Sequence, residues 1–160
     1  MAHNINGLIA SYDSLHRATA GMPEVRICKL NQDFGFWPDM DALSDVDHPA
    51  PMGEFYRFSE ALHQWAVDHS RAFPIAYIET EYFGGSGTQA AVVWKNGDVI
   101  WGPRQSSNEH DAPPQDPKLD PAISHALKRL GVEHGTAIDE FDALGLGRHR
   151  SNNDWWEDFQ

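Results

Sequence analysis

Three strand-like runs separated by glycine turns dominate the middle of the chain. Residues 75–83 alternate their side chains between two faces, and residues 88–95 and 98–101 flank the dipeptide Asn96-Gly97. This dipeptide favours a type I′ turn, which joins two antiparallel strands tightly. The expected hairpin has four cross-strand pairs: Lys95 with Asp98, Trp94 with Val99, Val93 with Ile100, and Val92 with Trp101. Apolar residues on both faces indicate strands that lie inside the sheet or are covered by helices.

Helical spacing of apolar residues is clearest in two segments. Residues 59–70 carry an apolar stripe and offer Ser59 as the N-cap. Residues 121–130 carry a second stripe and are followed by Gly131, a residue type that commonly ends helices. We therefore expect both helices to pack an apolar face against the sheet.

Shorter patterns extend the prediction toward both ends of the chain. Residues 8–20 have helical spacing and precede a Gly-x-Pro stop signal, so a short helix is expected there. Residues 25–30 alternate as a strand does, and residues 34–38 are expected to form a short extension or an aromatic corner. Thr136 with Asp139 resembles a capping box for a last short helix.

These elements predict one α+β domain over residues 1–160, with an antiparallel sheet of about four or five strands flanked by helices. Loops are expected near 45–57 and 104–119, where prolines and short polar residues accumulate, and a tail is expected near 151–160. Three aromatic side chains of that tail are expected to fold back onto the core: Trp155, Trp156 and Phe159.

Acidic residues outnumber basic ones, which restricts the choice of partner. The chain has 24 acidic and 12 basic side chains, and its formal net charge is −12. This charge opposes binding to nucleic acid or to an anionic membrane surface, and it favours a basic protein partner. The alternative interpretation is that the carboxylates only maintain solubility.

The remaining composition predicts a soluble cytoplasmic protein. The N-terminal residues lack the basic and apolar regions of a secretion signal, and the apolar runs are shorter than the about 20 residues of a membrane span. The single cysteine, Cys28, lies in the alternating run 25–30, which indicates a small strand side chain rather than a reactive thiol.

Two glutamates near the end of the first long strand are candidate site residues. Glu79 and Glu81 are two positions apart, so both carboxylates are expected on one face. Such a pair serves either as a general acid and base or as an acidic contact surface. Beside them, Tyr82, Gly84 and Gly85 are expected to shape a binding edge. The glycines resemble a phosphate loop, but the strand that follows favours a hairpin or a bulge.

Arg148 and His149 form the other candidate group. Basic residues are scarce in this chain, and these two follow a helix that Gly145 is expected to end. They either pair with Glu79 and Glu81 inside the fold or hold an anionic ligand. The histidines of the C-terminal half lack the familiar metal-binding spacings, so no metal and no cofactor is predicted.

Three segments resemble one protein family along almost the entire chain. They are Glu-Thr-Glu-Tyr-Phe-Gly-Gly-Ser-Gly-Thr-Gln-Ala-Ala at residues 79–91, the predicted helix at 123–132, and the run at 139–150 that ends in Gly-Leu-Gly-Arg-His-Arg. The family consists of small uncharacterised bacterial proteins from actinobacteria and proteobacteria. It is similar in size and acidity to immunity proteins, which neutralise polymorphic bacterial toxins.

We therefore expect a non-enzymatic acidic binding protein, an immunity-type inhibitor whose partner is a basic toxin domain. The alternative is a small hydrolase or ligand-binding enzyme that uses the Glu79 and Glu81 face together with Arg148 and His149. A third hypothesis is a self-associating subunit that forms a homo-oligomer.

Overall fold

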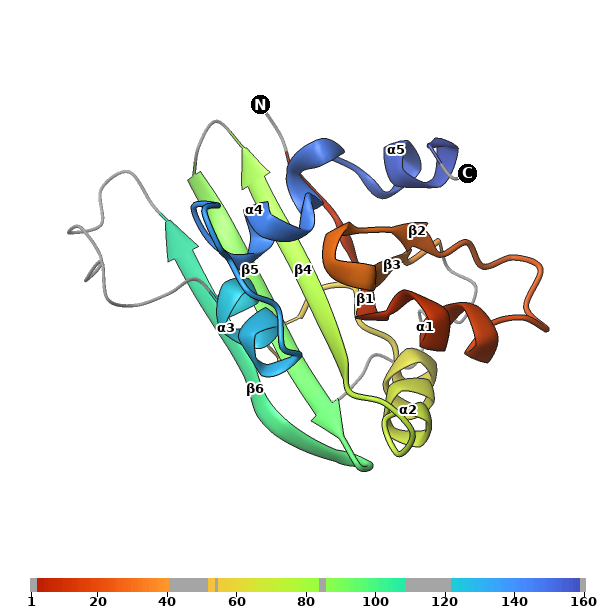
Figure 1. The fold of residues 1–160 in the computed structure, drawn as a ribbon. Coiled ribbons are helices and arrows are strands. Elements are labelled where there is room, and N and C mark those ends of the chain that lie inside the picture. The colour runs from red at the N-terminus through yellow and green to blue at the C-terminus, as the bar shows by residue number, and fades with distance from the viewer. Residues whose placement is uncertain (1–2, 41–51, 54, 84–85, 109–121, 159–160) are drawn as a thin grey trace.

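Six strands form one antiparallel sheet in the order β2-β3-β1-β4-β5-β6, and helices cover both of its faces (Figure 1). The computed structural model describes residues 3–40, 52–53, 55–83, 86–108 and 122–158. The strands are β1 (Asn6–Ser11), β2 (Cys28–Lys29), β3 (Phe34–Pro38), β4 (Ile75–Phe83), β5 (Ser86–Lys95) and β6 (Asp98–Asn108). The helices are α1 (Tyr12–Ala18), α2 (Glu60–His69), α3 (Ala122–Arg129), α4 (Glu140–Leu144) and α5 (Asn152–Glu157), with 3₁₀ turns η1 (Asn31–Asp33) and η2 (Leu146–Arg148). The α+β class with one antiparallel sheet is confirmed, and the strand number is higher than expected.

The N-terminal strand β1 lies in the middle of the sheet, between β3 and β4. The helix predicted over 8–20 is therefore wrong in its first part, because Leu8 and Ile9 lie in β1. Helix α1 begins only at Tyr12, with Ser11 as its N-cap. In a strand that is covered on both faces, neighbouring side chains are both apolar, so a short run resembles part of a helical stripe.

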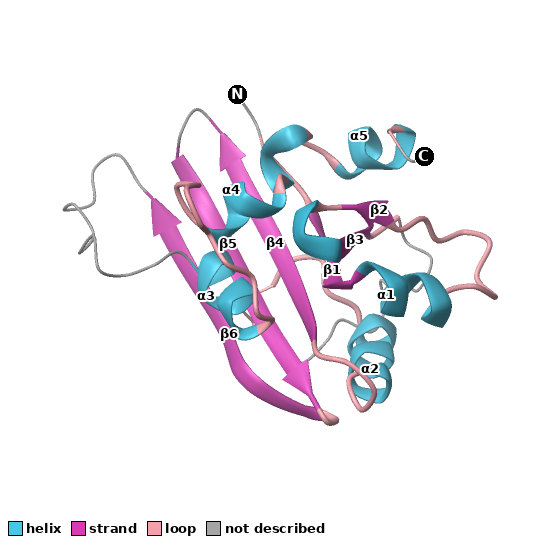
Figure 2. Cartoon of the chain, in the orientation of Figure 1, coloured by secondary structure: helices cyan, strands magenta, loops and turns pink. Residues whose placement is uncertain are grey.

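Alternation along β4 divides the apolar core into two layers. The α3 layer, on the face of α3 and α4, contains Ala76 and Ile78, whereas the α2 layer, on the face of α1 and α2, contains Ile75 and Tyr77. Figure 2 shows α3 and α4 in front of the sheet. Every β4 residue from 75 to 80 is buried, so both layers depend on this strand.

The two clearest helix predictions are confirmed. Helix α2 begins after Ser59, whose hydroxyl accepts a hydrogen bond from the Leu62 amide at 3.1 Å. Helix α3 is followed by Gly131, which adopts a positive φ of 95°. The last predicted helix forms as α4, but its N-cap is Asp139 and not Thr136. A carboxylate is the stronger acceptor for the free amides of a helix start, because it also interacts favourably with the helix dipole.

The β5–β6 hairpin has the predicted turn but only part of the predicted register. The two cross-strand pairs next to the turn form as expected. The other two pairs are wrong, since Val93 faces Trp101 rather than Ile100 where the register shifts at a β-bulge. Strand β6 also continues to Asn108, so the loop expected from residue 104 does not begin there.

The far edge of the sheet is built from β2 and β3. The strand expected over 25–30 is limited to Cys28 and Lys29, which pair with Phe36 and Gly35 of β3. The aromatic run expected as an extension forms β3 itself and pairs with β1 along its whole length.

The C-terminal segment forms helix α5 rather than a tail. Trp155 is buried and packs edge to face on Phe36, with 5.5 Å between the ring centroids, so its predicted return to the core is confirmed. The predicted segments 45–51 and 109–119, and Phe159, lie outside the described residues.

Trp94 of β5 is fully buried in the α2 layer, where its ring contacts Phe58 and His63. We predict that Trp94→Ala lowers the free energy of unfolding by about 3–5 kcal/mol, because the change removes a large buried ring and leaves a cavity. Urea denaturation measures this loss. Ile138→Ala is the control, since that side chain is 91% exposed and its effect should stay within about 0.5 kcal/mol. Equal effects of the two changes would contradict the placement of Trp94.

Candidate functional site

Glu79 lies in β4 on the side of the α2 layer, and its side chain is buried, with 7% exposure. Its Oε1 accepts a hydrogen bond from the Tyr56 amide at 2.9 Å. Its Oε2 accepts from the Arg57 amide at 3.2 Å and from the Tyr77 hydroxyl at 2.9 Å. Three donors hold the carboxylate, and it in turn fixes the segment that precedes α2 against β4.

Burial changes the ionisation of Glu79 and Tyr77. Burial raises the pKa of Glu79, while the hydrogen bonds from Tyr56, Arg57 and Tyr77 oppose the rise because they favour the ionised carboxylate. Burial and the neighbouring Glu79 charge raise the pKa of Tyr77 well above its ordinary value. The tyrosine therefore stays protonated and acts as a hydrogen-bond donor to the carboxylate.

Glu81 lies two residues further along β4 and borders the same surface depression as Glu79. We call this depression the acidic hollow; its lining includes Tyr56, Glu79, Glu81, Thr88 and Gln105. Glu81 is exposed and forms no hydrogen bond or ion pair with the residues that the structure describes. Tyr56 is also exposed, at 70%. The two glutamates thus differ in exposure, because Glu79 is buried beneath the acidic hollow and Glu81 faces solvent.

Arg148 and His149 are held by groups near the C-terminus and β2. The guanidinium of Arg148 donates to the Lys29 carbonyl at 2.7 Å and lies 5.1 Å from the ring centre of Trp155, a residue of the α3 layer. The Nε2 of His149 is 2.6 Å from a carboxylate oxygen of Asp158. Both side chains therefore have partners within the fold.

The predicted binding residues do not converge on one site. Glu79 and Glu81 lie on the α2 side of the sheet, whereas Arg148 and His149 border the α3 layer. The expected pairing of Arg148 with the glutamates is wrong, because the sheet lies between them and backbone carbonyls already accept from the guanidinium. The remaining predicted residues are Tyr82, which faces the α3 layer, and Gly84 and Gly85, which lie outside the described residues.

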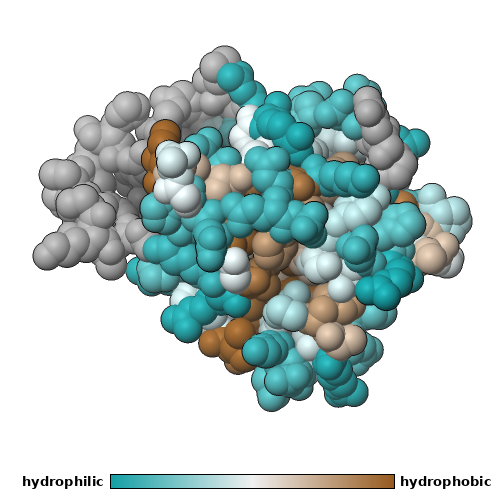
Figure 3. All heavy atoms as spheres, viewed as in Figure 1, coloured by the Kyte–Doolittle hydropathy of each residue, from teal (hydrophilic) through white to brown (hydrophobic). Residues whose placement is uncertain are grey.

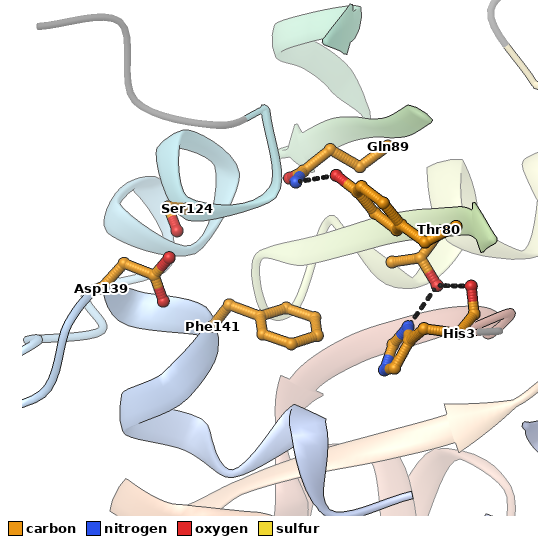
Figure 4. Close-up of a pocket in the computed structure, with 7 residues that line it drawn as sticks. His3, Thr80, Gln89, Ser124, Asp139 and Phe141 are labelled. Carbon is orange, nitrogen blue, oxygen red and sulfur yellow. Dashed lines mark hydrogen bonds between the residues drawn. The ribbon is translucent and has the colours of Figure 1, made fainter. Parts of the chain in front are cut away.

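The α3 layer contains a pocket of about 200 Å³ (Figure 4). It lies between β4, β5, α3 and the start of α4, and most of the surface that faces it is apolar, although most of its lining residues carry a polar group. The lining residues are Tyr82 and the six labelled in Figure 4. Residues that are far apart in sequence, such as His3 and Asp139, thus meet around one cavity.

Hydrogen bonds order the strand side of this pocket. The Thr80 hydroxyl lies 2.8 Å from Nδ1 of His3, and Gln89 Nε2 donates to the Tyr82 hydroxyl at 2.7 Å. Gln89 Oε1 also accepts from the Ile123 amide at the start of α3, at 2.9 Å. The strand residues are therefore fixed to one another and to the helix that forms the opposite side.

His3 contributes an imidazole ring to this pocket. Burial lowers its pKa from 6.5, the nearby Leu146 carbonyl raises it in part, and the Arg150 charge lowers it further. The imidazole is therefore neutral at pH 7. Its Nε2 is buried and, among the residues described, has no hydrogen-bond partner of normal geometry.

The helix side of the pocket carries two polar groups with free capacity. The Ser124 hydroxyl is buried and has no hydrogen-bond partner in the described part of the chain, and the residue is 1% exposed. Asp139 uses Oδ1 to accept from the Asp142 amide at 2.9 Å as the N-cap of α4, while its second oxygen bonds none of the described residues. Unpaired buried polar groups are rare in folded proteins, so Ser124 marks this wall as a place for a ligand or water.

Sequence reasoning missed His3, Ser124 and Asp139 as members of one site. They come from the N-terminal segment, α3 and the cap of α4, and no local motif connects them. Ser124 gave one signal, since it is a polar residue at the margin of the apolar stripe predicted over 121–130.

Comparison with known proteins adds no family. No protein-family model, curated protein or solved structure matches this chain, so the family resemblance stays a prediction. Among the described residues, no group of three or more His, Cys, Asp or Glu side chains is placed to hold a metal ion. In the same part of the chain, no helix combines the length and the apolar character needed to cross a membrane.

The raised pKa of Glu79 predicts a pH dependence of stability. The folded state binds the proton of the Glu79 carboxyl more tightly than the unfolded state. Protonated Glu79 therefore contributes to the free energy of unfolding below the unfolded pKa, and this contribution is lost as the pH rises through the folded pKa. We predict that the difference in unfolding free energy, wild type minus Glu79→Gln, decreases as the pH rises above 4.5. Urea denaturation at successive pH values measures it. The exposed Glu60→Gln serves as control, and a flat difference for Glu79 would contradict the prediction.

Cys28 is buried in β2, and its thiol donates to the Trp155 carbonyl at 3.3 Å. Burial, with a smaller effect of the Asp158 charge, raises the pKa of this thiol to about 11. We predict that DTNB labels Cys28 at pH 8 about 100-fold or more slowly in the native protein than in denaturing urea, because the thiolate is scarce and covered. Absorbance of the released thiol follows the rate. Similar rates in both states would show that the thiol is accessible.

Proposed function

We propose that this protein is a non-enzymatic acidic binding protein of the cytoplasm, an immunity-type inhibitor that covers a basic surface of a toxin domain. The observation that carries the proposal is the acidic hollow, where the exposed Glu81 carboxylate and the exposed Tyr56 ring border one surface of a chain with net charge −12. The Glu81 carboxylate has no partner among the described residues, so it is available to a lysine or arginine of another protein. Charge complementarity of this kind increases association rate and specificity.

Tyr56 is suited to anchor such a contact. Tyrosine is enriched among the residues that contribute most to binding at interfaces, because its ring buries a large amphipathic surface. The backbone of Tyr56 is held by the buried Glu79 carboxylate, so the ring extends from an ordered segment. Ordering before binding reduces the entropy lost on association.

The geometry favours this binding function over the hydrolase alternative. The alternative combines Glu79 and Glu81 with Arg148 and His149, and these side chains lie on opposite sides of the sheet. Glu79 also has three hydrogen-bond donors of its own, which leave it poorly placed to exchange a proton with a substrate.

Growth protection tests the proposal in cells that express the toxin encoded beside this gene. The wild type should restore growth, and Glu81→Lys and Tyr56→Ala should each weaken binding by about 2 kcal/mol or more, because one reverses a contact charge and the other removes an anchor. Glu133→Lys is the matched control, since it changes the net charge equally at an exposed position between α3 and α4.

Two outcomes would overturn the proposed function. One is the absence of protection by the wild type, and the other is equal protection by Glu81→Lys and Glu133→Lys. With a purified toxin domain, the association rate should also fall as salt concentration rises, because salt screens the attraction between exposed charges.

A further inference from the structure

The pocket of the α3 layer is large enough for a small organic molecule. Its volume is about 200 Å³. Apolar cavities of about 150 Å³ in proteins bind benzene, so this pocket has room for one ring and a short side chain. The mostly apolar surface that faces the pocket favours such a ring, and Phe141 and Tyr82 supply aromatic contacts.

The Ser124 hydroxyl is the polar group of this pocket that most needs a hydrogen-bond partner from a ligand. This hydroxyl is buried, lines the cavity and has no hydrogen-bond partner among the residues that the structure describes. Figure 4 shows it on α3, on the same side of the pocket as Asp139. A ligand with a polar end near these two residues would satisfy the hydroxyl, which otherwise remains desolvated at a cost to stability.

The charge of the lining residues determines which polar group of a ligand the pocket favours. Among the described lining residues, Asp139 carries the one carboxylate and none is a lysine or arginine, while burial keeps the His3 imidazole neutral at pH 7. One carboxylate oxygen of Asp139 caps α4, and the other remains available. A cationic group would pair with this oxygen and also interact with the ring of Phe141, whereas an anion would be repelled.

We propose that this pocket binds a small organic cation, a primary ammonium group attached through a short linker to a single apolar ring. The ammonium group lies between Asp139 and Ser124, donating to the free carboxylate oxygen and to the Ser124 hydroxyl oxygen. The ring lies against Phe141 and Tyr82. This site is on the opposite face of the sheet from the acidic hollow, so it goes beyond the proposed protein-inhibitor function and does not rest on it.

A series of three compounds with the same ring tests the charge preference on the wild-type protein. The probes are 2-phenylethylamine, the neutral 2-phenylethanol and the anionic phenylacetate, each titrated by isothermal calorimetry at pH 7. The amine should bind at least about tenfold more tightly than the alcohol, because it adds a charge-assisted hydrogen bond, and phenylacetate should bind most weakly. In two-dimensional NMR spectra, the amine should shift the resonances of His3, Ser124 and Phe141.

Asp139→Asn tests the residue that is assigned to the ammonium group. Asparagine is also a good N-cap, so α4 is retained while the charge is removed. The variant should lose at least about tenfold in affinity for 2-phenylethylamine and should bind 2-phenylethanol as the wild type does. Glu157→Gln removes one exposed carboxylate of α5 and should leave both affinities unchanged. Ser124→Ala should lower the affinity for the amine several-fold.

Three results would overturn the proposal. They are the absence of saturable binding of the amine at millimolar concentrations, binding of phenylacetate as tight as that of the amine, and resonance shifts located away from the pocket. The wild-type series decides these points even where a variant is less stable. The NMR spectrum shows whether the Asp139→Asn variant is folded. If the folded variant binds the amine as tightly as the wild type does, Asp139 is not the partner of the ammonium group.

Discussion

Burial of β4 on both faces is the constraint on which the rest of the structure depends. The strand pairs with β1 and β5, and both apolar layers pack on it. Because successive side chains of a strand point to opposite faces, Glu79 belongs to the α2 side and Thr80 to the α3 side. The acidic hollow and the α3-layer pocket are therefore back to back, and neighbouring residues of one strand support both.

Buried polar groups near the end of β4 tie other segments to these two surfaces. Glu79 accepts the amide hydrogen bonds that place Tyr56, and Thr80 accepts the Ile5 amide and contacts the ring of His3. A buried polar group that loses its partner destabilises the fold by more than the hydrogen bond had contributed. These hydrogen bonds therefore hold Tyr56, Ile5 and His3 in place as well as stabilising the fold. Changes at either β4 residue should thus alter a surface together with the core.

Local chemistry explains which parts of the fold were predictable. The cap at Ser59, the stop at Gly131 and the turn at Asn96-Gly97 depend on neighbouring residues alone, and all three are present. The pairing of strand β1 and the lining of the pocket depend on contacts between distant segments. The local pattern around Leu8 fits both a helix and a strand that is buried on both faces. Nothing near His3 in the sequence indicates that its side chain lies close to α3 and α4.

The closeness of the N-terminal segment to α5 has a consequence for biosynthesis. The Asn6 amide donates to the Asn152 side chain across 146 positions, and the Asn4 amide donates to the Arg150 carbonyl. During translation β1 emerges from the ribosome long before α5, and Phe36 lacks its Trp155 cover until α5 is made. The nascent chain therefore exposes part of its interior for most of its synthesis, the kind of surface that chaperones bind.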